Sequence, residues 1–380
     1  MHILIIASWY PSPLSSYSGN FVQEQVEALS KSGLKVGVIS SVFSPTITFK
    51  IFQSIRDKNY FLAQKSFTKR FSFLPSSTNY YWVNNGLELF KSYCETQGVP
   101  DVIHAHSALY GGRLALSIKK QFNIPFILTE HSSFLLQKKL PWWQLKMARA
   151  VYRNSYLNIA VSRYLKEKIQ QNFNLDKEKW RVLPNMINDS FFVSELHQPA
   201  KEKFIFLIIG MLIHVKGHHK LLKAFALVSE QLSLGTKIRI VGDGPQKESL
   251  LNLAKELGIE SQIEWHDSVP STEIAHMIQD AHVIVSSSEA ETFGLVLVEA
   301  LALGRPVVAL DSGGPRDIVN DSVGFLIPQG FIEDFSQALV NIQKNYSNYS
   351  PEKLRHYTQE RFHSSVIINS LYSAYKEIVA

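Results

Sequence analysis

Two glutamates eight positions apart are the first candidates for chemistry in this 380-residue chain. Glu291 and Glu299 lie in the stretch EAETFGLVLVEALALGRP, separated by a mostly apolar run. A carboxylate can stabilise positive charge in a transition state, and it accepts hydrogen bonds from hydroxyl groups. We expect a helix to begin near 293, with the free amides of Phe293, Gly294 and Leu295 pointing at an anion. An acid at a helix start also fits an ordinary N-terminal cap, so this stretch alone leaves both interpretations open.

A lysine followed by a glycine forms a second candidate anion site. In GMLIHVKGHHKLLKAF (210–225) a strand ends at Gly210, and Lys216 and Gly217 open the next helix. The helix dipole disfavours a lysine at this end unless an anion is bound nearby. Phosphate is the candidate anion. The alternative interpretation is that Lys216 faces solvent and binds no ligand.

Glycines also follow several other predicted strands. Gly19 and Asn20 precede an amphipathic helix, and a glycine there permits close backbone contact with a phosphate. Gly242 opens GDGPQK, where Lys247 occupies the place of the third glycine of a dinucleotide fingerprint. That fingerprint and the P-loop are therefore both absent. The stretch SGGPRDIV (312–319) fits either a close backbone approach or a plain turn.

Three histidines end neighbouring predicted strands. They are His104, His106 and His131, and no cysteine or carboxylate shares a helix-type ligand spacing with them. The chain also has no D-x-D triplet. We therefore expect no metal site, and we expect one of these histidines to be a polar contact for a ligand.

The elements that must position these residues are short apolar runs alternating with longer helical stretches. The first series of runs is 2–8, 35–40, 101–106, 125–131, 157–162 and 181–185. The second is 204–210, 237–243, 262–267, 282–288, 306–311 and 324–328. Near-continuous apolar strands that alternate with helices indicate parallel sheets covered on both faces. Two such series predict two doubly wound α/β domains, whose strand ends can face each other across a cleft.

The predicted domain boundaries follow from the same pattern. We expect an N-terminal Rossmann-like domain over 1–189, a polar linker over 190–203 and a C-terminal Rossmann-like domain over 204–363. The final stretch, 364–380, is expected to be helical.

Composition limits the class of protein. Hydrophobic residues make up 45% of the chain and charged residues 19%, as in soluble globular proteins. The single cysteine, Cys94, cannot form a disulfide within the chain, which suits a reducing cytoplasm. The apolar start is interpreted as a first strand, not as a signal peptide. The longest apolar run, 204–213, is about half a membrane span.

Charge is unevenly distributed along the chain. Residues 1–190 carry 23 basic against 11 acidic side chains, whereas the remainder carries 16 against 22. Residues 138–153 interleave lysines and arginines with two tryptophans, which suits an interfacial helix on anionic lipid. Residues 49–73 are similar in composition. Ordinary packing of the tryptophans in a helix pair is the alternative.

Together these motifs resemble the family-4 retaining glycosyltransferases of the GT-B fold over nearly the whole chain. The most specific match is the Glu-x7-Glu element formed by Glu291 and Glu299. The remaining matches are GMLIHVKG, the helix start at Gly19-Asn20, the His104/His106 and His131-Ser132 strand ends, LPNMI (183–187), GDGP (242–245) and SGGPRDIV.

The resemblance implies a role for each matched position in binding the nucleotide sugar, the donor of the reaction. Lys216 would neutralise the diphosphate, helped by the backbone of Gly19 and Asn20 and by the amides around Gly294. Glu299 would bind the ribose hydroxyls. The remaining implied roles are Glu291 beside the transferred sugar, His131 near sugar and acceptor, Phe293, Leu295, Gly242 and Asn185 in donor binding, and His104 and His106 on the acceptor side.

Two positions depart from the family pattern. Met211 stands where an arginine is usual, and nearby His214 is a candidate replacement. Asp267 stands where a glycine is usual, which puts the contacts to the nucleotide base in doubt.

The resemblance implies a retaining, metal-independent transferase that uses a UDP-sugar or GDP-sugar and needs no cofactor. We expect a lipid-linked glycan acceptor in cell-envelope polysaccharide synthesis, such as lipopolysaccharide, capsule or exopolysaccharide. We also expect a cytoplasmic location, peripheral on the inner face of the membrane. A nucleotide-sugar epimerase of the same fold is an alternative. A basic nucleic-acid-binding protein is another, but it lacks the RNP-type signals and leaves the glutamate pair unexplained.

Overall fold

The computed structural model describes residues 1–44, 48–55, 59–68, 77–132, 140–175, 179–200 and 202–379. The chain forms two compact units. The first contains Met1–Met186 together with Ser364–Ala380, and the second contains Ile187–His363.

The first unit is built on an eight-stranded sheet of order β3-β4-β2-β1-β5-β6-β7-β8. Its strands are β1 (His2–Ala7), β2 (Lys35–Phe43), β3 (Lys50–Ile55), β4 (Tyr60–Phe67), β5 (Val102–His106), β6 (Phe126–Glu130), β7 (Asn158–Ala160) and β8 (Trp180–Val182). Its helices are α1 (Asn20–Lys31), α2 (Ser77–Gln97), α3 (Arg113–Phe122), α4 (Trp142–Asn154), α5 (Arg163–Phe173) and α13 (Ser364–Val379), with a π-helical turn η2 (Ser107–Gly112). All pairings are parallel except that of β3 with β4.

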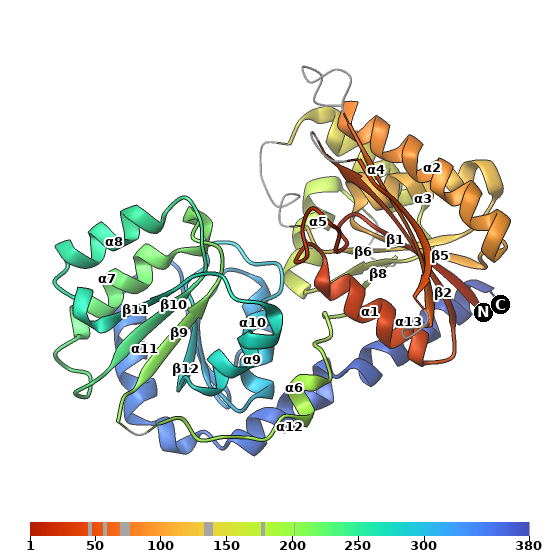
Figure 1. The fold of residues 1–380 in the computed structure, drawn as a ribbon. Coiled ribbons are helices and arrows are strands. Elements are labelled where there is room, and N and C mark those ends of the chain that lie inside the picture. Colours follow the sequence, from red (N-terminus) through yellow and green to blue (C-terminus); the bar gives the residue numbers. More distant parts are fainter. Residues whose placement is uncertain are drawn as a thin grey trace. The chain divides into compact units, whose positions relative to one another are not determined.

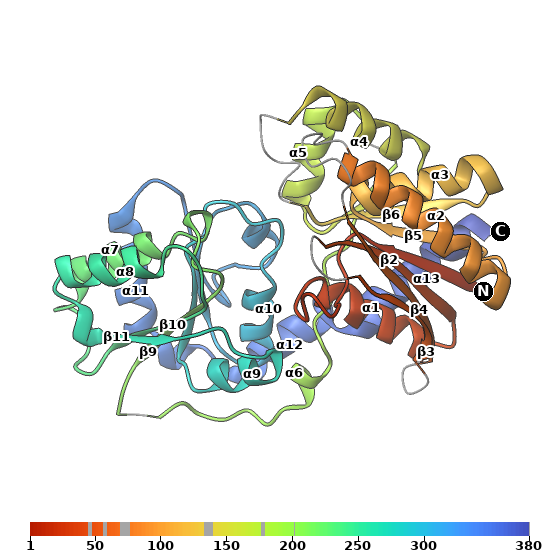
Figure 2. The ribbon, with the colours of Figure 1, turned by 45° about the horizontal axis from the view of Figure 1, so that its top comes forward.

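Helices cover both faces of this sheet, as Figures 1 and 2 show. Helices α1 and α13 lie on one face and α2, α3 and α4 on the other. Val22, Val26 and Leu29 recur with the helical period, and they bury one side of α1 in the same core as Leu371 of α13. The predicted helix over 364–380 is therefore present, and it is part of the first unit.

The prediction for residues 49–73 is wrong where the structure describes that segment. Residues 50–55 and 60–67 are strands β3 and β4, not an interfacial helix. They form an antiparallel pair, and β4 joins the sheet beside β2. The lysines and aromatic residues fit this position because the outermost strand of a sheet is exposed along one side.

The second unit is built on a fully parallel six-stranded sheet of order β11-β10-β9-β12-β13-β14. Its strands are β9 (Ile205–Ile209), β10 (Lys237–Val241), β11 (Ile263–His266), β12 (Val283–Ser286), β13 (Val307–Leu310) and β14 (Gly324–Ile327). Its α-helices are α6 (Ser190–Val193), α7 (His218–Val228), α8 (Lys247–Glu256), α9 (Ser271–Gln279), α10 (Leu295–Ala302), α11 (Ile332–Lys344) and α12 (Pro351–Phe362). Short 3-10 turns are η4 (His214–Lys216), η5 (Glu260–Gln262), η6 (Gly314–Asp317) and η7 (Tyr346–Asn348).

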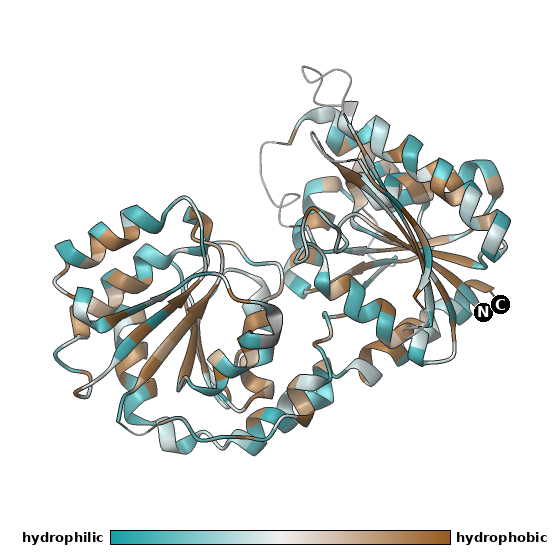
Figure 3. Ribbon diagram, viewed as in Figure 1, coloured by the Kyte–Doolittle hydropathy of each residue, from teal (hydrophilic) through white to brown (hydrophobic). Residues whose placement is uncertain are grey.

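Apolar strands form the centre of each unit, and helices carry polar residues outward, as the hydropathy colouring of Figure 3 shows. In the second unit α7, α8 and α11 cover one face of the sheet, and α9, α10 and α12 lie on the other (Figure 1). The predicted linker 190–203 is part of this unit and begins with the short helix α6. No helix in the described ranges is both long and apolar enough to cross a bilayer.

The strand order of each sheet fixes where a ligand site is expected. In the first unit β1 pairs with β2 on one side and β5 on the other, and in the second β9 pairs with β10 and β12. Connections leave these strands in opposite directions, which opens a crevice at their carboxyl ends. The loops after β1, β5, β9 and β12 therefore carry the candidate sites.

Candidate active-site residues in the two units

The loops after β9 and β12 bring Lys216 and Glu291 together. Lys216 Nζ donates to Glu291 Oε2 at 2.8 Å, and both side chains are partly exposed. Gly217 has a left-handed φ of 67°, and a Cβ there would lie 2.0 Å from the carbonyl oxygen of Ser287. The Ser287 hydroxyl in turn donates to the carbonyl oxygen of Lys216 at 3.0 Å. Close backbone packing thus fixes the lysine beside the glutamate.

The loop after β13 completes this arrangement. The amide of Glu291 donates to the Ser312 carbonyl at 3.2 Å, and the amide of Gly314 donates to the Glu291 carbonyl at 2.8 Å. A Cβ at Gly314 would lie 2.4 Å from the backbone nitrogen of Phe293. The SGGPRDIV stretch therefore makes a close backbone approach, one of the two interpretations that its sequence allowed.

The start of α10 presents unused donors next to the Lys216–Glu291 pair. Gly294 caps the helix with a φ of 116°. The amides of Gly294 and Leu295 donate to no other residue in the described part of the chain. The Phe293 side chain is buried against Phe362, so only its backbone can serve a ligand. Glu299 is partly buried about one turn inside the helix.

Further charged groups surround the pair. Glu289 accepts from Lys220 Nζ at 2.9 Å and lies 3.8 Å from His214 Nδ1. The hydrogen bond from Lys220 lowers the pKa of the Glu289 carboxyl. The sequence interpretation did not include Glu289 and Lys220, although each is close in sequence to a predicted site residue. Arg316, just after the loop at 312–314, donates to Asp311 at 2.6 Å.

The two departures from the family pattern have different surroundings. Met211 is 62% exposed, so its apolar side chain faces solvent where the family has a cation. The candidate replacement His214 lies near Glu289, and its ring lies 4.9 Å from that of His219 with the planes tilted by 37°. Asp267 is exposed and pairs with Lys247, whose hydrogen bond lowers the pKa of the aspartate.

Gly242 and Gly19 both allow a close approach within the protein. A Cβ at Gly242 would lie 2.0 Å from the Gly210 carbonyl oxygen, so the glycine lets the loops after β9 and β10 pack together. Gly19, with a φ of 75°, caps α1, and a Cβ there would lie 2.2 Å from the Trp9 carbonyl oxygen. Asn20 is the first residue of that helix.

In the first unit, the three predicted histidines form a stack. The rings of His104 and His106 lie 4.5 Å apart and those of His106 and His131 lie 5.1 Å apart, both nearly parallel. His104 is fully buried, and both ring nitrogens are hydrogen-bonded, to Thr129 and Tyr375. This placement gives His104 a structural role and leaves it no free nitrogen for an acceptor.

His106 and His131 share one hydrogen bond, between Nδ1 of His106 and Nε2 of His131 at 2.9 Å. Burial lowers the pKa of His106 to about 3 and also lowers that of His131. Both rings are therefore neutral near pH 7, and one proton lies between them. The Asn185 side chain acts on His131 in the opposite direction, raising its pKa. The structure thus places Asn185 beside His131, in the first unit.

A buried carboxylate at this strand end was not among the predicted residues. Glu130 accepts from the amides of Ala108, His131 and Ser132 and from the Tyr152 hydroxyl, at 2.9–3.1 Å. Burial raises the pKa of Glu130, and hydrogen bonds donated by its neighbours oppose that shift. A glutamate closing an apolar strand, directly before His131, is the sequence signal that could have identified it.

Glu130 also lines a pocket of about 220 Å³ at the ends of β1, β5 and β6. The other lining residues are Trp9, Ser107, Ala108, Leu109, Tyr110, Ser132 and Gln144. Ser107 has a φ of 64°, an unfavourable conformation for a residue other than glycine, and it begins the π-helical turn η2. Strained backbone and π-turns are frequent at functional sites. An indole, a phenol, a hydroxyl and an amide around a small pocket suit a polar organic ligand.

No group of three His, Cys, Asp or Glu side chains within the described ranges could hold a metal ion. Independence from metal remains a prediction for experiment.

Comparison with known proteins agrees with this arrangement. The model of "Glycosyl transferases group 1" matches residues 192–361, and that of "Glycosyltransferase Family 4" matches residues 18–191. The putative teichuronic acid biosynthesis glycosyltransferase TuaC of Bacillus subtilis is 25% identical over 90% of this chain and 89% of its own.

Solved structures share the fold. Sucrose-phosphate synthase from Thermosynechococcus elongatus matches with a TM-score of 0.80 at 20% identity, covering 100% of this chain and 99% of the other. Anabaena HepE in complex with UDP matches with a TM-score of 0.75 at 17% identity, covering 99% and 100%. The two family models together span both units, and the chain is a group 1 glycosyltransferase of family 4 with the GT-B fold.

Proposed function

We propose that this enzyme transfers a sugar from a UDP-sugar or GDP-sugar to a glycan acceptor, with retention of configuration and without a metal. The observation that carries the proposal is the Lys216–Glu291 ion pair beside the unused amides of Gly294 and Leu295. A cation and two free amides at a helix start suit a diphosphate. The complex of HepE with UDP supports a nucleotide-bound donor.

The proposed chemistry uses these groups in one displacement. The bond between the sugar C1 and the β-phosphate oxygen breaks, and a bond from C1 to the acceptor oxygen forms. The departing diphosphate takes the acceptor's hydroxyl proton, from the same face of the sugar. Lys216 and the amides at α10 stabilise the negative charge on the leaving group. Glu291 stabilises the positive charge that develops on the sugar ring.

Glu291 and Lys216 neutralise each other when no donor is bound. A bound diphosphate gives Lys216 a second anionic partner and leaves the Glu291 carboxylate free to act on the sugar. The pair therefore keeps both groups charged and in place before substrate arrives. In this proposal Glu299 binds the ribose hydroxyls, and Gly19 and Asn20 contribute backbone contacts to the phosphates.

The pocket lined by Trp9, Tyr110 and Gln144 is the proposed acceptor site. His131 directly precedes Ser132, a lining residue, and we propose that it donates or accepts a hydrogen bond with the acceptor. His106 determines whether His131 donates or accepts this hydrogen bond, because the position of the single proton between the two rings decides whether Nδ1 of His131 carries a hydrogen. His106 is thus proposed as a positioning residue, and not as one that touches the acceptor.

The test is release of nucleoside diphosphate from a panel of UDP-sugars and GDP-sugars, in EDTA, with membrane glycolipid extract as acceptor. We expect release from one donor class only in the presence of acceptor, with loss in Glu291→Gln. Conversion of the donor sugar without acceptor would instead show an epimerase, and no reaction with any donor would contradict the proposal.

We further propose a cytoplasmic enzyme that acts in cell-envelope polysaccharide synthesis, as the TuaC likeness suggests, and binds anionic membrane through α4. Trp142 of this helix is 74% exposed, Lys146 and Arg153 are exposed, and Ala148 and Val151 face the core. An exposed tryptophan beside lysines suits an anionic interface. Lys138 and Lys139, the first basic residues of this segment, lie outside the described residues.

Sedimentation with phosphatidylglycerol vesicles tests the membrane proposal. The double variant Trp142→Ala/Lys146→Ala should sediment less than the wild type, whereas Tyr80→Ala, at an exposed aromatic residue of α2, should not differ. Equal sedimentation of all three proteins, or failure of the wild type to sediment with the vesicles at low salt, would contradict the membrane proposal. Either result would leave the transferase proposal intact.

A further inference from the structure

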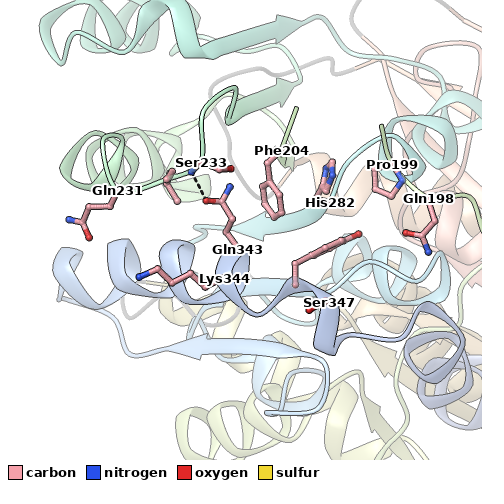
Figure 4. Close-up of a pocket in the computed structure, with 11 residues that line it drawn as sticks. Gln198, Pro199, Phe204, Gln231, Ser233, His282, Gln343, Lys344 and Ser347 are labelled. Atoms are coloured by element: carbon pink, nitrogen blue, oxygen red, sulfur yellow. Dashed lines mark hydrogen bonds between the residues drawn. The ribbon is translucent and has the colours of Figure 1, made fainter. Parts of the chain in front are cut away.

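The second unit has a large open pocket at the amino-terminal edge of its sheet, which we call the amino-edge pocket. Its volume is about 890 Å³, and its lining residues are Gln198, Pro199, Phe204, Gln231, Leu232, Ser233, His282, Gln343, Lys344, Tyr346 and Ser347. Phe204 and His282 directly precede β9 and β12, whereas Lys216 and Glu291 follow the same two strands. The pocket therefore lies at the opposite end of the sheet from the proposed donor site. Figure 4 shows its lining residues.

Three aromatic rings line one wall of the pocket, and Pro199 and Leu232 add further apolar surface. Phe204 lies 4.5 Å from His282 with its plane tilted by 32°, and it meets Tyr346 edge to face at 5.5 Å. His282 and Tyr346 lie 5.3 Å apart at 53°. No two of these rings are parallel, so they form no slot for a flat nucleobase. A pyranose can pack its face of C–H groups against one such ring while its hydroxyls reach the polar groups around it.

His282 supplies a hydrogen-bond donor at this wall of the pocket. The ring is 7% exposed, and its Nδ1 accepts a hydrogen bond from the Ile205 amide at 3.2 Å. The proton of the neutral ring is therefore on Nε2, which has no hydrogen-bond partner among the described residues. Burial, with a smaller effect of the Arg305 charge, lowers the pKa of His282 to about 4, so the ring remains neutral near pH 7. An imidazole N–H in a pocket wall, with no hydrogen bond to the described residues, can donate to a ligand that accepts hydrogen bonds.

The loop opposite is held in place before any ligand binds. Gln343 accepts from the Ser233 amide at 2.9 Å and donates to the Thr236 hydroxyl at 2.9 Å. Figure 4 shows the bond from Ser233 to Gln343 across one end of the pocket. Both polar atoms of this amide are used, so Gln343 shapes the pocket, and the exposed amides of Gln198 and Gln231 are left to contact a ligand.

The charge of the lining selects among sugars. Lys344 is exposed at the rim, and none of the residues that line the pocket is an aspartate or glutamate. A neutral sugar is usually held by carboxylates that accept from its hydroxyls, and these are missing from the lining described here. A lysine, an imidazole N–H and amide N–H groups instead match the carboxylate of a uronic acid.

We propose that the amino-edge pocket binds pyranose residues of a glycan that carries uronic acids. The volume is enough for more than one sugar residue, and the open rim allows the glycan chain to continue beyond the pocket. This binding is separate from transfer: it needs neither Lys216 nor Glu291, and it would hold a glycan on the enzyme between rounds of reaction.

The test is saturation-transfer NMR and calorimetry on the full chain with saturating UDP, using trigalacturonate as the probe and maltotriose as the neutral comparison. Irradiation of aromatic protons should give the strongest signals at the C–H protons of one sugar face. We expect trigalacturonate to bind more tightly than maltotriose, with a difference that shrinks as salt rises.

Variants on the exposed rim separate this site from others without risk to the fold. Lys344→Ala should raise the Kd for trigalacturonate about threefold to fivefold. Lys223→Ala, at an exposed lysine of α7 away from the pocket, should leave it unchanged. Lys216→Met should keep trigalacturonate binding unchanged while its Kd for UDP rises. Absence of trigalacturonate binding, equal binding of maltotriose, or an unchanged Kd in Lys344→Ala would each overturn the proposal.

Discussion

Replacing Lys216 should weaken the binding of a nucleoside diphosphate, whereas replacing its partner Glu291 should strengthen it. The pair is 2.8 Å long with side chains 33% and 21% exposed, so it contributes no more than about 1 kcal/mol to the stability of the free protein. Lys216→Met should therefore lower the melting temperature by no more than about 4 °C. A charge-assisted hydrogen bond to a phosphate contributes about 1.5–3 kcal/mol, so the same change should raise the Kd for UDP roughly 10- to 150-fold.

Glu291→Gln should act in the other direction on binding. It removes the carboxylate that competes for Lys216 and repels the diphosphate. Two like charges about 6 Å apart at an effective dielectric constant near 40 repel by roughly 1.4 kcal/mol, so the Kd for UDP should fall by up to about tenfold. Sugar transfer should nevertheless drop at least about 100-fold, because the positive charge on the sugar loses its carboxylate.

Titration calorimetry with UDP measures both variants, and Lys220→Met is the matched control. Lys220 makes a similar 2.9 Å ion pair, with Glu289. Its replacement should change the Kd for UDP less than Lys216→Met does. Unchanged affinity in Lys216→Met, or equal weakening in Lys216→Met and Glu291→Gln, would refute the assignment of Lys216 to the diphosphate.

Three further predictions concern the packing that supports the site. Gly217 and Gly258 have nearly the same left-handed φ, 67° and 68°, but of the two only Gly217 has a backbone oxygen 2.0 Å from the position that a Cβ would take. Gly217→Ala should therefore lower the free energy of unfolding in urea by at least about 2 kcal/mol more than Gly258→Ala does. Equal losses would contradict the close packing at Gly217. His106 has a folded pKa of about 3 against 6.5 unfolded, so it destabilises the fold as pH falls below 6.5, by about 1.4 kcal/mol at pH 5.5; His106→Gln should lose stability less steeply between pH 7.5 and 5.5, and an unchanged slope would show that this ring is not a buried neutral group. Glu130→Ala leaves buried donors unsatisfied and should lower the free energy of unfolding by about 3–5 kcal/mol, whereas Tyr152→Phe removes one donor and should lower it by about 1–2 kcal/mol. Unfolding followed by circular dichroism measures both variants. A larger loss in Tyr152→Phe than in Glu130→Ala would contradict the proposal that Glu130 holds these groups together.

The strands that build the site could be predicted because they are short, continuous apolar runs between helical stretches. Each of the predicted runs overlaps a strand of the structure, although β2 continues beyond its run and β8 begins one residue before its run. From the local motifs alone, the helix start beside Glu291 and the stretch at Lys216 were predicted as two separate anion sites. The strand order joins them, since β9 and β12 are neighbours and their carboxyl ends meet. The helix start near Phe293 was also predicted, and Glu299 lies about one turn into α10.

Features that depend on tertiary contacts could not be predicted. Strands β3 and β4 contain lysine and glutamine among apolar residues, so their composition alone also fitted a membrane-surface helix. The role of Glu130 depends in part on the Ala108 amide, which the π-turn after β5 presents to it, and no sequence pattern marks that turn. His104 looked like a ligand contact until α13 placed Tyr375 against it, across 271 positions of sequence.

The most direct test of the donor site is a thermal-shift screen of the full chain with UDP, GDP, ADP and NAD, each with and without magnesium. We predict that UDP or GDP stabilises the protein without magnesium, and that Lys216→Met removes the shift. Stabilisation by NAD alone, or by none of the four, would contradict the donor site and show that Met211 and Asp267 belong to a fold that serves another purpose.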